Sequence, residues 1–215
     1  MPNLPISQLP AAAPLTGSEL FAIVQEGVTK QVSLSSVVTS LSTNYGLFNQ
    51  TGSSAPVSGS THVSGSLIGG GVGTLTIPAN GFSKGDAFQA TFSGIINAQN
   101  NKTLEITIKA GNIVLADTGV ITMPGITGDK RWRMDIDFSI NEIGGAGVAS
   151  IATAGTISFR TDSSGDVITE IFSTVNNTTF DTTISNTLVV EAEWGNSPSD
   201  LSSIYSKLFT LLKVY

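Results

Sequence analysis

Few side chains in this sequence could do chemistry. The chain has one histidine, His62, and no cysteine. His62 lies in the Gly- and Ser-rich stretch TGSSAPVSGSTHVSGS, where a general base would be hard to hold in a fixed orientation. Without cysteine the chain has no disulfides and no thiolate metal sites, and the usual pairs of nucleophile and base have almost no members. We therefore expect no catalytic residue, no cofactor and no enzyme activity.

Two pairs of carboxylates remain as candidates. Each pair lies two residues apart on an expected strand, so both members point to one face. The pairs are Asp135 with Asp137, and Glu191 with Glu193. Such pairs can ligate Ca²⁺ or act as acid and base in a glycosidase. Because Arg131 and Arg133 share the face of the two aspartates, cross-strand ion pairing on a solvated surface is the simpler interpretation, and we expect no metal site.

The stretch GSLIGGGVG has glycines at spacings that suggest a phosphate-binding loop. No helix with Lys-Ser or Lys-Thr follows it, and the next residues, TLTIPANGF, read as strand and turn. We therefore expect these glycines to form bends or bulges at a sheet edge. The sequence assigns no ligand-binding residue.

Composition and charge exclude several classes of partner. Only 12% of the 215 residues are charged, and the formal net charge is -6. The ten basic residues are scattered rather than clustered, so we expect no nucleic-acid partner. No run of about eighteen apolar residues occurs, and the amino terminus MPNLPISQLP lacks the basic region and apolar stretch of a secretory signal. We expect no membrane insertion and no export by a cleaved signal.

Most of the chain alternates apolar and polar residues with a period of two, which is typical of strands with one solvated face. Three stretches show the pattern most clearly: RWRMDIDFSI, TLEITIKA and LVVEAEW. Their inward residues are Trp132, Met134, Ile136, Phe138, Ile140, Leu104, Ile106, Ile108, Leu188, Val190, Ala192 and Trp194. Because both tryptophans lie on apolar faces, we expect them in the core rather than stacked on a sugar.

The number and spacing of strands predict an all-β domain. Further strands are expected at 72–77, 87–96, 113–115, 120–123, 148–153, 156–160, 167–175, 180–184 and 206–214. About ten strands in about 150 residues, separated by turn signals, indicate a β-sandwich or a jelly roll. The last strand, in SKLFTLLKVY, is apolar on both faces and is expected to be a central strand buried on both sides. In an oligomer its outward residues would lie at a subunit boundary.

The first 45 residues are organised differently. Leu20 to Gln25 reads as a strand, Glu26-Gly27 as a turn and Val28 to Val32 as the return strand of a hairpin. Four apolar residues then follow at helical spacing and predict a short helix with one apolar stripe. They are Leu34, Val37, Val38 and Leu41. We expect an amino-terminal module over 1–45, a Gly- and Ser-rich joint over 46–70 and a jelly-roll domain over 71–215.

The predicted hairpin needs an external surface. Its strand LFAIVQ is apolar on both faces, and one short helix can cover only one of them. Because an isolated two-stranded hairpin is marginal in water, we expect the module to be buried against copies of itself or a foreign surface. Folding back onto the larger domain is the alternative. The predicted attachment or oligomer-interface residues are Leu20, Phe21, Ile23, Val24, Val28, Val32, Leu34, Val37, Val38 and Leu41.

The same amino-terminal stretch resembles a module of phage and large-virus structural proteins, chiefly tail fibres, head fibres and capsid decoration proteins. The shared pattern is I-S-x-L-P, then L-T-G-x-E-L, V-Q-x-G-V-T-K and a short S-x-x-V segment, and it covers about a fifth of the chain. The matching residues are Ile6, Ser7, Leu9, Pro10, Leu15, Thr16, Gly17, Glu19, Leu20, Val24, Gln25, Gly27, Val28, Thr29 and Lys30. The resemblance implies a non-enzymatic virion component, usually a homotrimer, whose module trimerises or attaches to the capsid or tail, followed by a jelly roll.

Three functions follow as hypotheses. The first is a structural virion protein held to the particle by residues 1–45, with the jelly roll projecting outward. The second, compatible with the first, is a receptor- or glycan-binding jelly roll at the tip of a tail fibre. A carbohydrate-degrading tailspike is the third, but it normally needs longer repeats and carboxylates on a concave face, which the sequence does not show.

Overall fold

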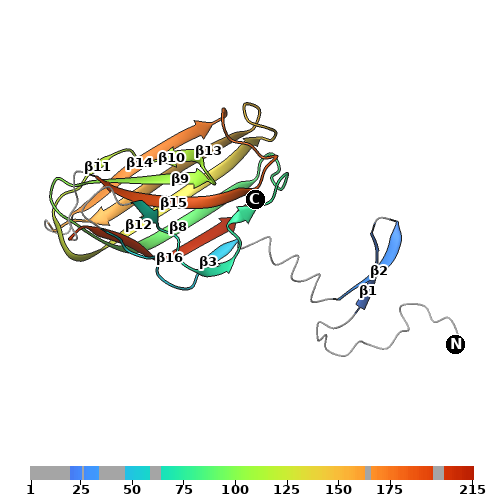
Figure 1. The fold of residues 1–215 in the computed structure, drawn as a ribbon, viewed down its shortest axis with the longest axis horizontal. Helices are drawn as coiled ribbons and strands as arrows, with labels where there is room; N and C mark the ends of the chain where they lie inside the picture. Colours follow the sequence, from blue (N-terminus) through green and yellow to red (C-terminus); the bar gives the residue numbers. More distant parts are fainter. Residues whose placement is uncertain (1–19, 26, 34–46, 59–63, 163–165, 196–200) are drawn as a thin grey trace. The chain divides into compact units, whose positions relative to one another are not determined.

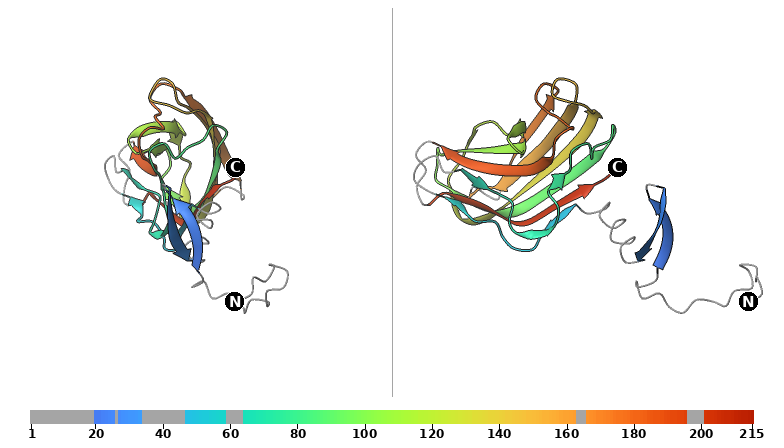
Figure 2. Two further views of the ribbon diagram at one scale, coloured as in Figure 1. Left: turned by 90° about the vertical axis from the view of Figure 1, so that its right-hand side faces the viewer. Right: turned by 45° about the vertical axis from the view of Figure 1, so that its right-hand side comes forward.

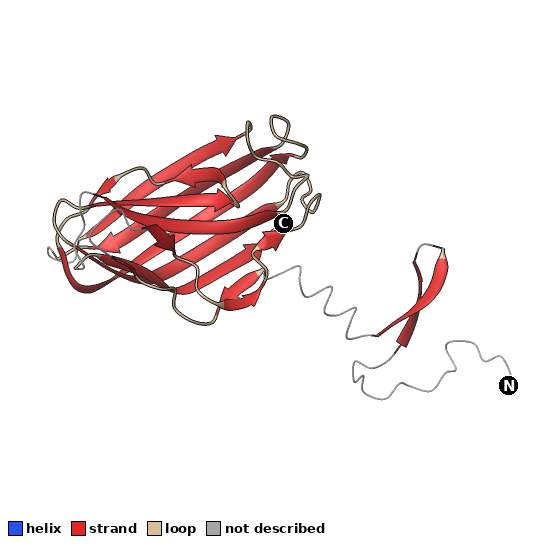
Figure 3. Ribbon diagram, in the orientation of Figure 1, coloured by secondary structure: helices blue, strands red, loops and turns tan. Residues whose placement is uncertain are grey.

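The structure is a computed structural model of the 215-residue chain that describes residues 20–25, 27–33, 47–58, 64–162, 166–195 and 201–215. Every regular element formed by these residues is a β-strand (Figure 3). The chain divides into two compact units, Met1–Asn44 and Tyr45–Tyr215. The helix expected around residues 34–41 lies outside the described residues.

The described part of the first unit is a β-hairpin. Strands β1 (Leu20–Gln25) and β2 (Val28–Ser33) pair antiparallel, with Gln25 opposite Val28. Between them Gly27 has a φ of 76°, a left-handed conformation that glycine adopts without steric cost. The predicted hairpin and its turn are therefore confirmed.

The second unit contains the remaining strands, most of which are long. They are β3 (Phe48–Gln50), β4 (Val57–Ser58), β5 (Ser64–Ser66), β6 (Gly71–Gly73), β7 (Thr76–Ile77), β8 (Ala87–Ala98), β9 (Thr103–Ala110), β10 (Ile113–Asp117), β11 (Ile121–Thr122), β12 (Ile126–Glu142), β13 (Ser150–Arg160), β14 (Val167–Asn176), β15 (Asn186–Gly195) and β16 (Ser203–Lys213).

These strands form two antiparallel sheets that lie face to face (Figures 1 and 2). The eight-stranded sheet has the order β14-β13-β12-β8-β16-β3-β6, and β4 also pairs with β16. The six-stranded sheet has the order β10-β9-β15-β5, with β11 on β9 and β7 on β15. The all-β prediction is confirmed, and the arrangement is that of a β-sandwich.

The inner faces of the sheets form one core. All the inward residues predicted from the three alternating stretches are buried except Leu188, which is partly buried, so the predicted period-two faces are confirmed. An aromatic row crosses the eight-stranded sheet: Phe92 stacks on Phe209 with ring centroids 4.2 Å apart, and Trp132 and Phe48 extend the row on either side. Such offset ring pairs add to the stabilisation from apolar burial.

The expected joint over residues 46–70 differs from the structure. Strands β3, β4 and β5 lie in this stretch, and Val57 and Leu67 are buried in the core. Composition suggests flexibility here, but a few apolar side chains are enough to anchor the segment. Glycine also serves close packing at the predicted sheet edge, because a Cβ on Gly71 of the edge strand β6 would lie 2.4 Å from the backbone oxygen of Asn49.

Three predicted strand assignments are wrong. The single strand expected at 72–77 is two short strands, β6 and β7, which belong to different sheets. Residues 180–184 form a loop that is held by the buried Phe180 side chain rather than by ladder pairing. The two strands expected at 148–153 and 156–160 are one strand, β13. The glycine between them, Gly155, leaves room for the Phe172 ring of β14, since a Cβ there would lie 2.6 Å from the ring.

The last strand, β16, is central in its sheet but is not buried on both sides. Its backbone pairs with β8 on one edge and with β3 and β4 on the other. Only one of its faces meets the second sheet, so Leu208, Leu212 and Val214 are exposed, Leu208 at 63%. The prediction of double burial failed because two apolar faces do not by themselves show that two layers are present.

Gly94 of β8 is a position where the fold has no room for a side chain. A Cβ at this residue would lie 2.0 Å from the carbonyl oxygen of Tyr205 and 2.7 Å from Nε1 of Trp132. These two atoms are themselves joined, because the Trp132 indole N–H donates to the Tyr205 carbonyl at 3.1 Å. Gly94 thus permits the hydrogen bond between β12 and β16 across β8.

We expect Gly94→Ala to lower the free energy of unfolding by about 3 kcal/mol, because the added methyl group forces backbone atoms apart. Gly125→Ala is the control: its Cβ would meet nothing closer than 3.7 Å, and we expect a change within about 0.5 kcal/mol. Urea unfolding followed by tryptophan fluorescence measures both. Equal unfolding midpoints for the two variants would contradict the assignment.

Candidate functional site

The hairpin residues predicted as an interface divide between two faces. In the register of the hairpin, Phe21 lies opposite Val32 and Ile23 opposite Lys30. Since directly opposite residues share a face, Phe21, Ile23, Val28 and Val32 lie together on one side. Leu20, Ala22, Val24, Thr29 and Gln31 lie on the other side.

Both faces of this hairpin are exposed. Leu20 is 62% exposed and Val24 74% on one face, and Phe21 is 47% exposed on the other. Ile23 and Val28 are exposed and Val32 is half-buried. The six predicted interface residues that the structure describes therefore divide into four on one face and two on the other, while Leu34, Val37, Val38 and Leu41 lie outside the described residues. Large apolar side chains exposed on both faces of one hairpin make it the candidate interaction surface of the chain's described part.

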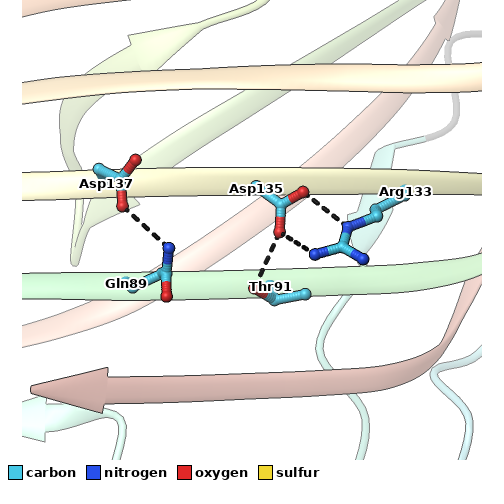
Figure 4. A network of polar contacts seen from close by, with 5 residues as sticks. All are labelled: Gln89, Thr91, Arg133, Asp135 and Asp137. Carbon is cyan, nitrogen blue, oxygen red and sulfur yellow. Dashed lines mark hydrogen bonds and ion pairs between the residues drawn. The ribbon is translucent and has the colours of Figure 1, made fainter. Parts of the chain in front are cut away.

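The aspartate pair on β12 belongs to a polar network on the outer face of the eight-stranded sheet (Figure 4). Arg133 donates two hydrogen bonds to Asp135, from Nε at 2.7 Å and from Nη2 at 2.9 Å, and the Thr91 hydroxyl donates a third at 2.9 Å. Gln89 donates to Asp137 at 3.3 Å. The hydrogen bond from Arg133 holds the pKa of Asp135 below its ordinary value, against the opposing effect of partial burial.

These hydrogen bonds determine what the carboxylates can do. An aspartate whose pKa is lowered stays ionised and is a poor general acid. The predicted ion pairing is present, but Arg133 and Asp135 pair along one strand rather than across strands. On the other sheet, Glu191 pairs with Lys109 across strands at 2.5 Å. Among the described residues, no group of three or more His, Asp or Glu side chains is placed to hold a metal ion.

Other residues considered from the sequence are accounted for by packing or lie outside the described part. Trp132 and Trp194 are buried, and the Trp194 indole donates to the Val57 carbonyl at 2.9 Å, so both are core residues as predicted. His62 is not among the described residues. Within the described ranges, no helix long and apolar enough to span a membrane is present.

The sequence did not predict one further feature of the outer face: the three arginines lie close together there. The chain has three, Arg131, Arg133 and Arg160. Trp132 and Phe159 point inward and lie opposite each other, so the next residues along, Arg131 and Arg160, face outward side by side on β12 and β13. Alternation alone placed the first two arginines outward. The third joins them through the β12-β13 register, which the sequence did not specify.

Acid should weaken the network around Asp135. Because its folded-state pKa is lowered, its charged form stabilises the fold at pH values above about 4, and this contribution is lost as the pH falls through the lowered value. We expect Asp135→Asn to cost less than about 1 kcal/mol near neutral pH, as for other surface ion pairs. The variant should then lose less stability than the parent on acidification. Urea unfolding at about pH 7 and about pH 3 checks this, and an equal loss in both proteins would contradict it.

Comparison with known proteins identified no family for this chain. No protein-family model matches the chain, and no curated protein matches it in sequence. The functional conclusions therefore depend on the two surfaces described above and on the resemblance of the amino-terminal motif.

Proposed function

We propose that this chain is a non-enzymatic structural protein of a virion, of the fibre or capsid-decoration type. In this proposal the hairpin module trimerises the chain and attaches it to the capsid or tail, and the sandwich projects from the particle. The observation that carries the proposal is the hairpin with two exposed apolar faces. The motif resemblance in residues 6–38 supports the same role.

Symmetry favours a closed ring over a two-fold dimer for this hairpin, and the resemblance of the amino-terminal motif gives the number of subunits as three. A two-fold dimer uses one self-complementary patch, and a hairpin paired in this way covers one face and leaves the other exposed. In a ring of three or more, each hairpin has two neighbours and uses two different patches, one for each. The face with Phe21 and Ile23 and the face with Leu20 and Val24 are two such patches.

The strand pairing of the larger unit supports a jelly-roll topology. Its pairs are nested along the chain: β3 with β16, β5 and β7 with β15, β8 with β12, and β9 with β10. This is the order that results when one long hairpin is rolled into two sheets. In this scheme β13 and β14 are an additional hairpin at the edge of the eight-stranded sheet. Jelly rolls recur in viral capsid and lectin domains, so the fold is compatible with the proposed role.

A receptor- or glycan-binding role for the projecting jelly roll is the second candidate. The specific observation that favours it is the convergence of three arginines on one solvated face. The two roles are compatible, because one depends on the hairpin and the other on the sandwich.

Light scattering during size-exclusion chromatography tests the proposal. We expect the full chain to have three times its 22.2 kDa monomer mass. Phe21→Asp and Val24→Asp, one on each face, should each give monomers with an unchanged β-sheet circular dichroism spectrum, because a buried unpaired charge is strongly unfavourable. Val120→Asp is the matched control, since this valine is exposed in the sandwich. A monomeric parent, or variants that remain trimeric, would rule out the hairpin as the oligomer interface.

A further inference from the structure

The arginines of the outer face lie in two adjacent rows across the eight-stranded sheet. The first row runs across β14, β13, β12, β8 and β16. The register pairs Val167 with Arg160, Arg131 with Ile95, and Ile95 with Tyr205, and Arg131 and Arg160 are the residues next to the last β12-β13 pair, Trp132 with Phe159. The second row contains Thr169, Ser158, Arg133 and Ser93. At a strand spacing of about 4.8 Å, the first row is about 19 Å long. The three guanidinium groups thus have the hydroxyls of Thr169, Ser158 and Ser93 beside them and a tyrosine ring at one end of the first row, whereas Val167, Ile95 and, at the end of the second row, Leu208 are apolar members.

Two of these arginines have no partner in the described part of the chain. Arg133 is neutralised by its two hydrogen bonds to Asp135. Arg131 and Arg160 are exposed, and no carboxylate of the described residues forms an ion pair with either. Because Arg131 and Arg160 are next to the opposed pair Trp132 and Phe159, their like charges lie close together on neighbouring strands, and this destabilises a sheet. A bound anion would remove this cost.

The type of side chain narrows the class of anion. A guanidinium is planar and binds carboxylate or sulfate oxygens through two parallel hydrogen bonds, which a lysine ammonium does not do. The row is exposed and crosses strands, so it suits an extended ligand rather than a small molecule in a cleft. Hydroxyls beside the arginines and the Tyr205 ring at the end of the row are suited to hydrogen bonding and stacking with sugars. Nucleic acid is disfavoured because the two rows contain only one aromatic side chain, Tyr205, whereas single-stranded nucleic acid is bound by several aromatic rings on which successive bases stack.

We propose that Arg131 and Arg160 form the centre of a binding site for an acidic polysaccharide, whose carboxylate or sulfate groups bridge the two guanidinium groups. The site specifies the ligand class for the receptor-binding role given above as the second candidate, and it rests on that role. Lys207, which lies over the Tyr205 ring at 5.9 Å from its centroid, adds a cation at the same end of the row.

Binding of defined polysaccharides to the full chain tests the site. The probes are heparin for sulfate, polygalacturonate for carboxylate, and neutral dextran as the uncharged reference, measured by biolayer interferometry at low salt. We expect the parent to bind one or both acidic probes and not dextran. The double variant R131Q/R160Q should bind about a hundred-fold more weakly, because removal of each guanidinium should weaken binding about ten-fold. The acidic probe that binds identifies the anionic group.

The matched control removes two positive charges elsewhere on the sandwich. Lys84 and Lys102 lie outside the arginine rows, so K84Q/K102Q should bind within about two-fold of the parent. Failure of the parent to bind either acidic probe, an equal loss of affinity in the lysine control, or equally tight binding of single-stranded DNA would overturn the proposal. Light scattering of R131Q/R160Q separates the two proposals, because a trimer that no longer binds polysaccharide supports the site, whereas a trimer with undiminished binding refutes the site alone.

Discussion

A two-stranded hairpin cannot bury apolar side chains on both of its faces by itself. The β1-β2 hairpin carries Phe21 and Ile23 on one face and Leu20 and Val24 on the other, and these side chains are exposed in the single chain. Because removal of apolar surface from water is the main driving force of association, this exposure is a strong reason for the hairpin to meet other molecules. Oligomerisation and attachment to a particle are two ways of satisfying the same constraint.

The larger unit does not share this constraint. Its two sheets bury their own inner faces against each other, and the polar network that includes Arg133 and Asp135 lies on the outer face of the eight-stranded sheet. A self-sufficient sandwich can change its outer side chains without loss of the core, which is why a solvated face is a suitable place for recognition. Arg131 and Arg160 are exposed on such a face. Their neighbours in the chain, Trp132 and Phe159, point into the core, so the two arginines point away from it.

The predictions from sequence were correct where a short local pattern of residues determines the structure. Alternation in RWRMDIDFSI gave the buried side of β12, and Glu26-Gly27 gave the hairpin turn, because both depend on neighbouring residues alone. Prediction from sequence failed where contacts between residues far apart in the chain determine the structure. The short strands β3, β4 and β5 are held by pairing with β16 and β15, Phe180 is held by the core, and Arg160 meets Arg131 only through the β12-β13 register. None of these partners can be read from a local pattern.

Hydrogen–deuterium exchange over a dilution series tests most directly whether other copies of the chain shelter the hairpin. The account predicts that the amides of β1 and β2 are protected at high concentration and become exchangeable when dilution separates the subunits, while those of β8 and β12 stay protected throughout. Protection of the hairpin that does not change with dilution would instead indicate that it folds back onto its own chain. Rapid exchange at every concentration would show that nothing covers it, and either result would contradict the account.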